Sequence, residues 1–377
     1  MAEADQLHRL TNRDKIGGPD AQKKSFPARC HCSRVRFSIT LAAAALPLRG
    51  YLCHCGACRR SHGSPAGFYV ILPPGVAPEW EEESSRDVLA RWEGEAGRET
   101  LFCPTCGSHV GGYRPGLGQW AVTWGVFEDK FWELSFHACA ESGGMADWLP
   151  AVPHLSLGAG VSPENDVASS WELSGQGSDR TDESRLLRAE CACGGVSFSI
   201  TRPTRAIIDD AYMGRYVHTD DDNDDSQANK NKWKAFLDMC RDCGRATGAT
   251  AVAWALIPRI AIADPPLPPD LQGFGSMRTH RSSERVTRGF CGRCGATVLL
   301  STTRREPTRE QAVLDIAVGI LRVDDVRLED WVVWRTGNVA WADDARGFDA
   351  EFTDALVTGF WEWGVKTQGQ ALDFAVF

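Results

Sequence analysis

The sequence lacks any hydrophobic run long enough to cross a membrane. Its longest apolar stretches, such as Leu41 to Leu46, are far shorter than the roughly 20 residues that a transmembrane helix needs. Residues 1–18 are polar and of mixed charge, which differs from a secretory signal. We therefore expect neither a membrane partner nor secretion, and we predict a cytoplasmic protein.

The sequence also lacks an excess of positive charge. Its 41 lysines and arginines stand against 50 aspartates and glutamates, which gives a formal net charge of −9. A protein that mainly binds a phosphate backbone needs the opposite sign, so nucleic acid is not an expected partner. The GxxxxGK(S/T), HExxH and GxSxG patterns are absent as well, which argues against a P-loop nucleotide triphosphatase, an HExxH protease and an α/β-hydrolase. We expect a small-molecule substrate.

Cysteine and tryptophan, by contrast, are abundant, with 14 of each in 377 residues. A chain of this length is expected to hold two domains or three. Because no secretory signal is seen, the cysteines are expected to stay reduced. Clustered reduced cysteines are more often metal ligands or catalytic groups than disulfides, and zinc is the leading candidate metal.

Thirteen of the cysteines form two series with the same order of motifs. The first series is Cys30-His31-Cys32, then Cys53-His54-Cys55-Gly56-Ala57-Cys58, then Cys103-Pro104-Thr105-Cys106, and the second is Cys191-Ala192-Cys193, then Cys240-Arg241-Asp242-Cys243, then Cys291-Gly292-Arg293-Cys294. The pairs that lie 185 positions apart are Cys55 and Cys240, Cys58 and Cys243, Gly63 and Gly248, and Pro73 and Pro258. This ungapped register indicates an internal duplication, and only Cys139 falls outside the two series of motifs.

The duplication predicts two tandem domains, at 26–150 and at 186–345. Residues 1–25 are expected to form a flexible arm, and 151–185, rich in Ser, Gly and acidic residues, a linker. In the C-terminal extension, 346–377, the spacing of apolar residues from Phe348 to Gly364 predicts one amphipathic helix. The sequence leaves open whether the two domains pack as an intramolecular pseudo-dimer.

The second copy carries an insertion at Thr219 to Lys232 with a run of aspartates: Asp220, Asp221, Asp222, Asp224 and Asp225. A solvated loop is the expected structure of such a charge run. A carboxylate calcium site is the alternative, although the run lacks the Gly and Glu of the helix-flanked calcium loop.

Most of the predicted secondary structure is β, so we expect a mainly β fold in both copies. Val35 to Ile39 and Val196 to Ile200 alternate apolar and polar residues as half-buried strands do. Phe68 to Leu72 and Ala251 to Ile257 are apolar runs ended by a proline. A third corresponding pair of predicted strands is Trp120 to Phe127 and Val313 to Leu321.

The CxC and CxxCG motifs of each copy can supply four thiolates to one zinc ion if the fold brings them together. Structural zinc sites prefer such a closed tetrahedron. We assign one site to Cys30, Cys32, Cys103 and Cys106, and a second to Cys191, Cys193, Cys291 and Cys294. The alternatives are free buried cysteines or disulfides.

The middle motif of the first copy offers only three sulfurs, those of Cys53, Cys55 and Cys58. Three ligands leave one coordination position open, which is characteristic of catalytic zinc. A thiol bound there would lose its proton below its usual pKa, and the metal could also polarise an oxygen. The cations and imidazoles around this motif, which could hold a carboxylate or carry a proton, are His54, Arg59, Arg60 and His62. Their alternative role is that of solvated loop charges.

The middle motif of the second copy is altered. In the register of 185 positions, Asp238 takes the place of Cys53, while Cys240 and Cys243 remain. Aspartate can ligate zinc, so these three residues form a fourth candidate site, or an empty one. We favour the first copy as the active one, because its set of sulfurs is complete.

These motifs resemble those of the glutathione-dependent formaldehyde-activating enzyme family, which includes centromere protein V. The family pattern is a CxCGxVxF start, a CHCxxCR(K/R) middle and an RxFCxxCG(S/T) end. The second copy matches the start at Cys191, Cys193, Gly194, Val196 and Phe198 and the end at Arg288, Phe290, Cys291, Cys294, Gly295 and Thr297, and the first copy matches the middle at Cys53, His54, Cys55, Cys58, Arg59 and Arg60. The first copy departs from the pattern at Ser33 and at Thr100, where glycine and arginine are usual.

The resemblance implies two zinc-bound β-tent domains with a closed structural zinc and a three-cysteine zinc. It also implies carbon-sulfur lyase or synthase chemistry on an adduct of glutathione and an aldehyde. Cys53, Cys55 and Cys58 would then be the working ligands, with glutathione as a co-substrate.

Other functions stay open, because a fold does not fix an activity. One is a diverged lyase, dehydratase or isomerase that acts on a larger electrophilic metabolite without glutathione. Another is a zinc-stabilised interaction module without catalysis, and a third is a redox switch made of the three sulfurs. Tryptophans that could line an apolar pocket, although a core role is the stronger expectation for each, are Trp80, Trp92, Trp120, Trp124, Trp132 and Trp254. Cys139 is expected to be a buried thiol.

Overall fold

The computed structural model describes residues 11–18, 21–81, 88–94, 98–140, 144–155, 186–219 and 231–376. Most of the predicted linker and part of the predicted arm therefore lie outside the described residues. The aspartate run from Asp220 to Asp225, with its calcium alternative, lies outside them too.

The first half consists of a small sheet and a large one. The small sheet has the strand order β1 (Lys23–Arg29), β2 (Arg36–Ala42), β5 (Glu79–Trp80). The large sheet has the strand order β11 (His154–Leu155), β10 (Trp132–Ala138), β3 (Leu48–Cys53), β4 (Gly67–Ile71), β9 (Gln119–Thr123), β8 (His109–Arg114), β7 (Glu99–Phe102), β6 (Ala90–Glu93). Its strands pair antiparallel except at β3 and β11, each of which runs parallel to β10.

The second half repeats this arrangement. Its small sheet has the order β12 (Leu186–Glu190), β13 (Ser197–Thr201), β17 (Ile262–Ala263). Its large sheet has the order β14 (Val217–His218), β15 (Lys232–Asp238), β16 (Val252–Pro258), β21 (Val313–Ala317), β20 (Thr297–Thr302), β19 (Val286–Cys291), β18 (Met277–Arg281), and β22 (Val332–Trp334) runs parallel to β15 as β10 does to β3. The same strand order in both halves agrees with a duplication. The domain boundaries stay a prediction.

Helices are few and, with one exception, short. The α-helices are α2 (Gly56–His62), α4 (Arg205–Ile208), α5 (Arg241–Thr247) and α6 (Ala342–Gln368). The 3-10 helices are η1 (Ala43–Ala45), η4 (Gly144–Ala146), η6 (Met213–Tyr216), η7 (Arg259–Ala261), η8 (Thr303–Arg305) and η9 (Val318–Ile320). None of the helices in the described part of the chain combines the length and the apolar character that a membrane crossing needs.

The mainly β character is confirmed, and each of the six predicted strands overlaps a strand of the structure. The predicted segment from Val313 to Leu321 is strand only as far as Ala317, after which the chain turns into η9. The predicted terminal helix is also present. α6 extends beyond it at both ends and is kinked at Asp349, inside the predicted segment. Helices α2 and α5 were not predicted, because each is a single short helix inside a cysteine motif.

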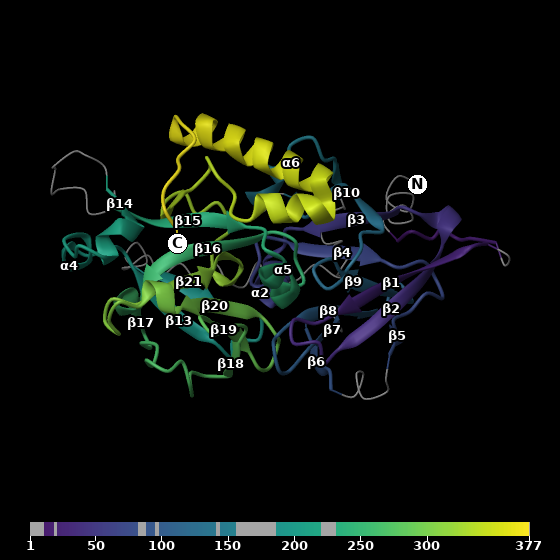
Figure 1. The fold of residues 1–377 in the computed structure, drawn as a ribbon, viewed down its shortest axis with the longest axis horizontal. Helices are drawn as coiled ribbons and strands as arrows, with labels where there is room; N and C mark the ends of the chain where they lie inside the picture. Colours follow the sequence, from purple (N-terminus) through teal and green to yellow (C-terminus); the bar gives the residue numbers. More distant parts are fainter. Residues whose placement is uncertain are drawn as a thin grey trace.

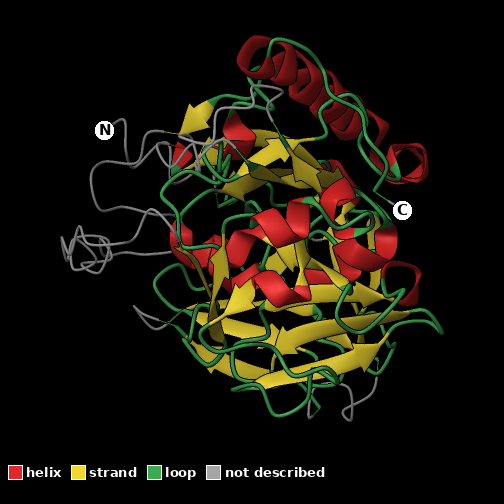
Figure 2. Cartoon of the chain, turned by 90° about the vertical axis from the view of Figure 1, so that its left-hand side faces the viewer, coloured by secondary structure: helices red, strands yellow, loops and turns green. Residues whose placement is uncertain are grey.

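The two halves lie side by side, with α2 and α5 between them and α6 across the top of both (Figure 1). Figure 2 shows the same arrangement from the side, with short helices in the middle, strands around them and the long helix above. Phe352 of α6 packs against Phe68 and Trp124 of the first half. Further along the helix, Phe360 packs against Trp334 of the second half. The helix therefore joins the cores of both halves.

The backbones of the two halves approach closely where α2 and α5 meet the opposite sheet. The Gly125 amide donates to the Gly248 carbonyl at 2.9 Å. A Cβ on Gly63, whose φ is +75°, would lie 2.1 Å from the Thr297 carbonyl oxygen. Only glycine allows this approach at that backbone angle. In addition, Glu128 of the first half accepts from Arg245 of the second at 2.6 Å.

Candidate metal centres

The structure brings together the ligand atoms of all four groups that the sequence predicts. Within each group these atoms lie within 4.8 Å of one another. The groups are Cys30, Cys32, Cys103 and Cys106; Cys191, Cys193, Cys291 and Cys294; Cys53, Cys55 and Cys58; and Asp238, Cys240 and Cys243. The four-sulfur groups join the turn after the first strand of each half to the turn between two strands of the large sheet.

The donors of the four-sulfur groups fit zinc. In the first half, the Cys32 sulfur is 3.5 Å from that of Cys30 and 3.6 Å from that of Cys103. The amide of Val35 donates to the Cys30 sulfur at 3.3 Å, and a hydrogen bond of this kind orients a thiolate ligand and stabilises its charge. The hydrogen bond with Cys103 lowers the pKa of Cys32 to about 7. Four converging thiols of this kind would hold the metal in a closed shell.

The three-sulfur group of the first half sits where β3 leads into α2. Cys53 is the last residue of β3, and Cys55 is the N-cap of α2, where its sulfur accepts from the amide of Cys58 at 3.4 Å. Cys53 and Cys58 have no exposed surface, and Cys55 is 8% exposed. The group is therefore enclosed in protein.

A fourth sulfur, from Cys139, lies against this group. Ala138, the last residue of β10, pairs with Cys53 across the parallel strands, and the next residue turns back with a φ of +53°. Cys139 forms side-chain hydrogen bonds with both Cys53 and Cys55. The bond with Cys53 is the main reason why the pKa of Cys53 is well above its ordinary value. Sequence reasoning placed Cys139 outside the motifs, because its proximity comes from strand pairing rather than from spacing.

The predicted cations around the three sulfurs are mostly tied to the fold. His54 and His62 are buried, and burial is the first cause that lowers their pKa values, well below the ordinary range for His54 and to about 3 for His62. Both are therefore neutral at pH 7. Arg59 is buried and donates to the carbonyls of His54 and Val323. Burial also lowers the pKa of the half-buried Arg60 to about 10. The side chains of His54, Arg59 and His62 are therefore buried, so they are not solvated loop charges.

Each three-donor group has an arginine that sequence reasoning did not assign to it. Arg98 donates to the Cys58 sulfur at 3.0 Å, and both terminal nitrogens of Arg288 lie 3.5 Å from the Cys243 sulfur. The sequence of the first copy has Thr100 where the arginine is usual. Arg98, two residues earlier, nevertheless reaches the sulfur.

The second-half group has the same backbone setting with different donors. Asp238 ends β15 and Cys240 is the N-cap of α5. One carboxylate oxygen of Asp238 accepts from the Cys243 thiol at 3.0 Å and from the Trp254 indole at 3.1 Å. An aspartate and two thiols are donors that zinc accepts, so this group fits the metal as well.

Unlike the first group, the second-half group opens onto a cavity of about 800 Å³. Besides Asp238, Cys240 and Cys243, the cavity is lined by Phe236, Arg241, Asp242, Ser283, Glu284, Arg285, Val286, Arg288, Leu300, Thr302, Arg304, Arg305, Asp315, Trp341 and Asp344. Asp315 is ion-paired with Arg305, and burial raises the pKa of Asp315 to about 6 although Arg305 opposes the shift.

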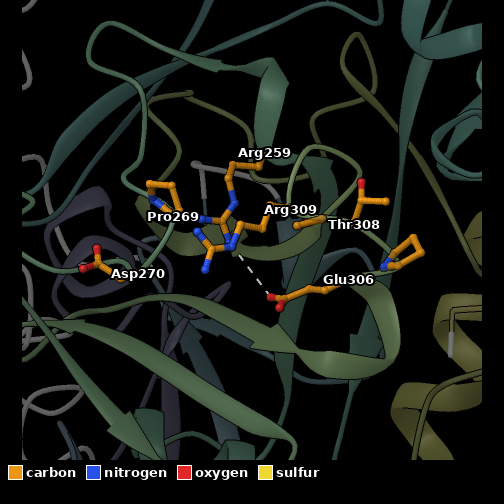
Figure 3. Close-up of a pocket in the computed structure, with 8 residues that line it drawn as sticks. Arg259, Pro269, Asp270, Glu306, Thr308 and Arg309 are labelled. Atoms are coloured by element: carbon orange, nitrogen blue, oxygen red, sulfur yellow. Dashed lines mark ion pairs between the residues drawn. The ribbon is translucent and has the colours of Figure 1, made fainter.

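A separate cavity of about 720 Å³ contains none of the metal-ligating groups. In Figure 3, Arg259 and Arg309 lie near its centre, with Asp270 and Glu306 on either side. Arg259 and Glu306 form an ion pair of 3.9 Å, which is the dashed line. These charges are exposed or paired with each other, so this cavity offers no reactive group.

The core role that is the stronger expectation for the candidate pocket tryptophans is confirmed, and the Trp254 indole in addition donates to Asp238. Trp124, Trp132 and Trp254 are buried in the core, and Trp80, Trp92 and Trp120 pack against it. By contrast, the tryptophan that lines the second-half cavity is Trp341, which is 52% exposed.

Taken together, the sheets and the sulfur groups define a mainly β protein with clusters of cysteines that could hold metal ions. Residues 25–141 match the family model of the glutathione-dependent formaldehyde-activating enzyme, so this part of the chain is similar to that family. The match ends before the second copy of the cysteine motifs. A comparison with curated proteins finds no match to this chain.

Proposed function

We propose that this protein is a zinc-dependent enzyme of the carbon-sulfur lyase or synthase type. Its substrate would be the adduct of a thiol, such as glutathione, with an aldehyde or a related small electrophile. The family match of residues 25–141 supports the reaction class. The observation that carries the proposal is the pair of three-donor groups, each with an arginine on a cysteine sulfur.

At Asp238, Cys240 and Cys243, three protein donors would leave a fourth coordination position for the substrate, whereas Cys139 places a fourth sulfur against the first-half group. A zinc ion at such a site lowers the pKa of a bound thiol and polarises a bound oxygen. The contribution of the protein is to hold the donors and to keep them anionic. Burial raises the pKa of Cys58, and the hydrogen bond with Cys240 followed by burial raises the pKa of Cys243. Arg98 and Arg288 oppose these shifts, because a nearby guanidinium favours the thiolate form of the cysteine it contacts.

The proposed reaction balances without an oxidant or a reductant. In the synthase direction, the thiol sulfur forms a bond to the aldehyde carbon, and the thiol proton moves to the aldehyde oxygen. In the lyase direction, the same carbon-sulfur bond breaks and the proton returns. The two copies would pack as an intramolecular pseudo-dimer, an arrangement that the contacts of α2 and α5 with the opposite half support.

The alternative is a zinc-stabilised interaction module without catalysis. The enclosure of the Cys53, Cys55 and Cys58 group favours this role for the first half, because an enclosed metal has no access to substrate. A matched pair of variants separates the two functions. Cys55→Ser and Cys240→Ser each remove the N-cap sulfur of a short helix, one in each half, and neither touches a four-sulfur group.

The test is the rate at which zinc-loaded protein equilibrates glutathione and formaldehyde with their adduct, measured by exchange NMR. We expect the wild-type protein to exceed the rate in buffer, and at least one of the two variants to fall to that rate. Circular dichroism and zinc content show whether each variant stays folded and keeps its four-sulfur sites. A wild-type rate equal to buffer, or two folded variants with the wild-type rate, would overturn the proposal.

A further inference from the structure

We infer that the two copies divide their roles, and that the ligand-binding site lies in the second half at Asp238, Cys240 and Cys243. The ligand would be a small thiol or thiol adduct that carries a carboxylate and an apolar portion. This inference rests on the proposed function for the thiol chemistry. It reverses the expectation from sequence, which favours the half with the complete set of sulfurs.

The two three-donor groups differ in how accessible they are to a substrate. The second-half group lines a cavity of about 800 Å³, within the range of small-molecule sites, whereas the sulfurs of Cys53 and Cys58 are fully enclosed. Around the enclosed group, the side chains of His54, Arg59 and His62 are buried as well. A substrate can reach the second group without any displacement of the core.

The two three-donor groups also differ in the residue that faces them from the neighbouring strand. In the first half, the His54 amide donates to Ala138, and the following residue, Cys139, places its thiol against Cys53 and Cys55. In the second half, the Met239 amide donates to Ala340 in the same way.

The residue that follows Ala340 is Trp341, which has a similar positive φ of 61° but lines the cavity. One turn of the same geometry therefore covers the first group with a protein sulfur and leaves the second group facing open space.

The second-half cavity is lined in part by buried polar atoms that lack a hydrogen-bond partner among the described residues. Asp315 is 2% exposed, and its Oδ1 has no hydrogen-bond partner among the described residues, as is true of the Nε of Arg288. Buried polar atoms of this kind are costly unless a ligand or water pairs with them. Their position points to a polar ligand in this cavity.

The exposed charges at the cavity rim are mixed, with Arg285 and Arg304 beside the acidic residues Asp242, Glu284 and Asp344. Arg285 and Arg304 are exposed, and no ion pair is found for either of them among the described residues. Guanidinium groups in this position suit a carboxylate. The apolar part of the cavity wall includes Phe236, Val286 and Leu300.

The test is calorimetric binding of two probes to zinc-loaded protein, at concentrations that leave zinc on the protein. The probes are 3-mercaptopropionate, which carries a carboxylate, and 2-mercaptoethanol, which does not. We expect one equivalent of 3-mercaptopropionate per chain. The double variant Arg285→Ala and Arg304→Ala should bind it about tenfold more weakly, while its affinity for 2-mercaptoethanol stays the same.

Cys139→Ala is the matched variant in the first half, and we expect it to bind 3-mercaptopropionate as the wild type does. Both rim arginines are exposed, so their replacement leaves the core intact, and circular dichroism checks the fold of every variant. An unchanged affinity in the double variant would overturn the inference. A large change of affinity in Cys139→Ala would overturn it too, because the binding site would then lie in the first half.

Binding and turnover separate this inference from the proposed function. If the second half binds the probe as expected but no adduct is turned over, the proposed function fails and the site stands. If turnover is present but is lost only in Cys55→Ser and not in Cys240→Ser, the proposed function stands and the division of roles fails.

Discussion

The imidazole Nδ1 of His62 lies 2.7 Å from the carbonyl oxygen of Thr247, a residue 185 positions further along the chain. This separation is the register of the duplication, so each residue holds the place in its own half that the other holds in the opposite half. His62 ends α2 and Thr247 ends α5. The hydrogen bond therefore ties the two corresponding helices together where the halves meet.

This contact fixes the protonation of His62. Because Nδ1 must donate to a carbonyl, a neutral ring is left to accept the Tyr69 hydroxyl at Nε2, at 2.7 Å. Burial first, and His109 next, lower the pKa of His62 to about 3. Above the ordinary pKa of about 6.5, the folded and unfolded forms are both neutral, and the contribution of His62 to stability is complete.

As pH falls below 6.5, the His62 imidazole binds a proton in the unfolded chain but stays neutral in the folded protein. The free energy of unfolding therefore decreases by up to about 1.4 kcal/mol per pH unit until the folded pKa is reached. His62→Gln removes the titrating group, and Gln can still donate and accept. We expect the wild type to lose about 2 kcal/mol more than this variant between pH 7 and pH 5, measured by urea unfolding in excess zinc. Equal losses would contradict this account.

The close approach at Gly63 gives a second prediction. Gly63→Ala meets two penalties, the left-handed backbone and a Cβ 2.1 Å from the Thr297 carbonyl oxygen. Gly75 is the matched control, because its φ is +79° and nothing lies within 4 Å of its Cβ position. Gly75→Ala should cost about 1–2 kcal/mol of unfolding free energy, and Gly63→Ala clearly more, measured by denaturant unfolding. If both variants lose the same amount, the two halves are not packed as tightly as described.

The four-sulfur groups give a third prediction. A structural zinc site supplies about 10–16 kcal/mol of folding free energy. Cys106→Ser should therefore lose one zinc ion per chain and unfold the first half, measured by elemental analysis and near-ultraviolet circular dichroism. Thr105→Ala, which alters the residue between the two ligands of the same turn, should keep the metal and the fold. A folded Cys106→Ser variant with the wild-type metal content would exclude this site.

Local spacing made much of this structure predictable. Two cysteines in a CxxC motif lie close in almost any conformation, and each half contains a CxC motif that pairs with the last CxxC motif. The proximity of all four metal-ligating groups was therefore predicted residue by residue. Alternation of apolar residues likewise predicted the strands, and the spacing of Phe352, Leu356 and Phe360 predicted the terminal helix.

Other features had no local signal. The short helices α2 and α5 begin at cysteines whose sulfurs act as N-caps, a role that cysteine seldom signals in sequence. The neutral state of His62 depends on burial against the opposite half. Arg59 looked like a solvent-facing cation, but its guanidinium binds the carbonyl of Val323, which is 264 positions away.

The sequence by itself determined the sulfur donors and the mainly β fold, and it predicted the duplication, because short motifs and their regular spacing carry this information. Only the tertiary structure decided which donors are enclosed and which face a cavity. Access depends on the residues that pack over a group from distant strands. In this protein those residues are Cys139 over one group and Trp341 beside the other, and neither belongs to a motif that is repeated in the two copies.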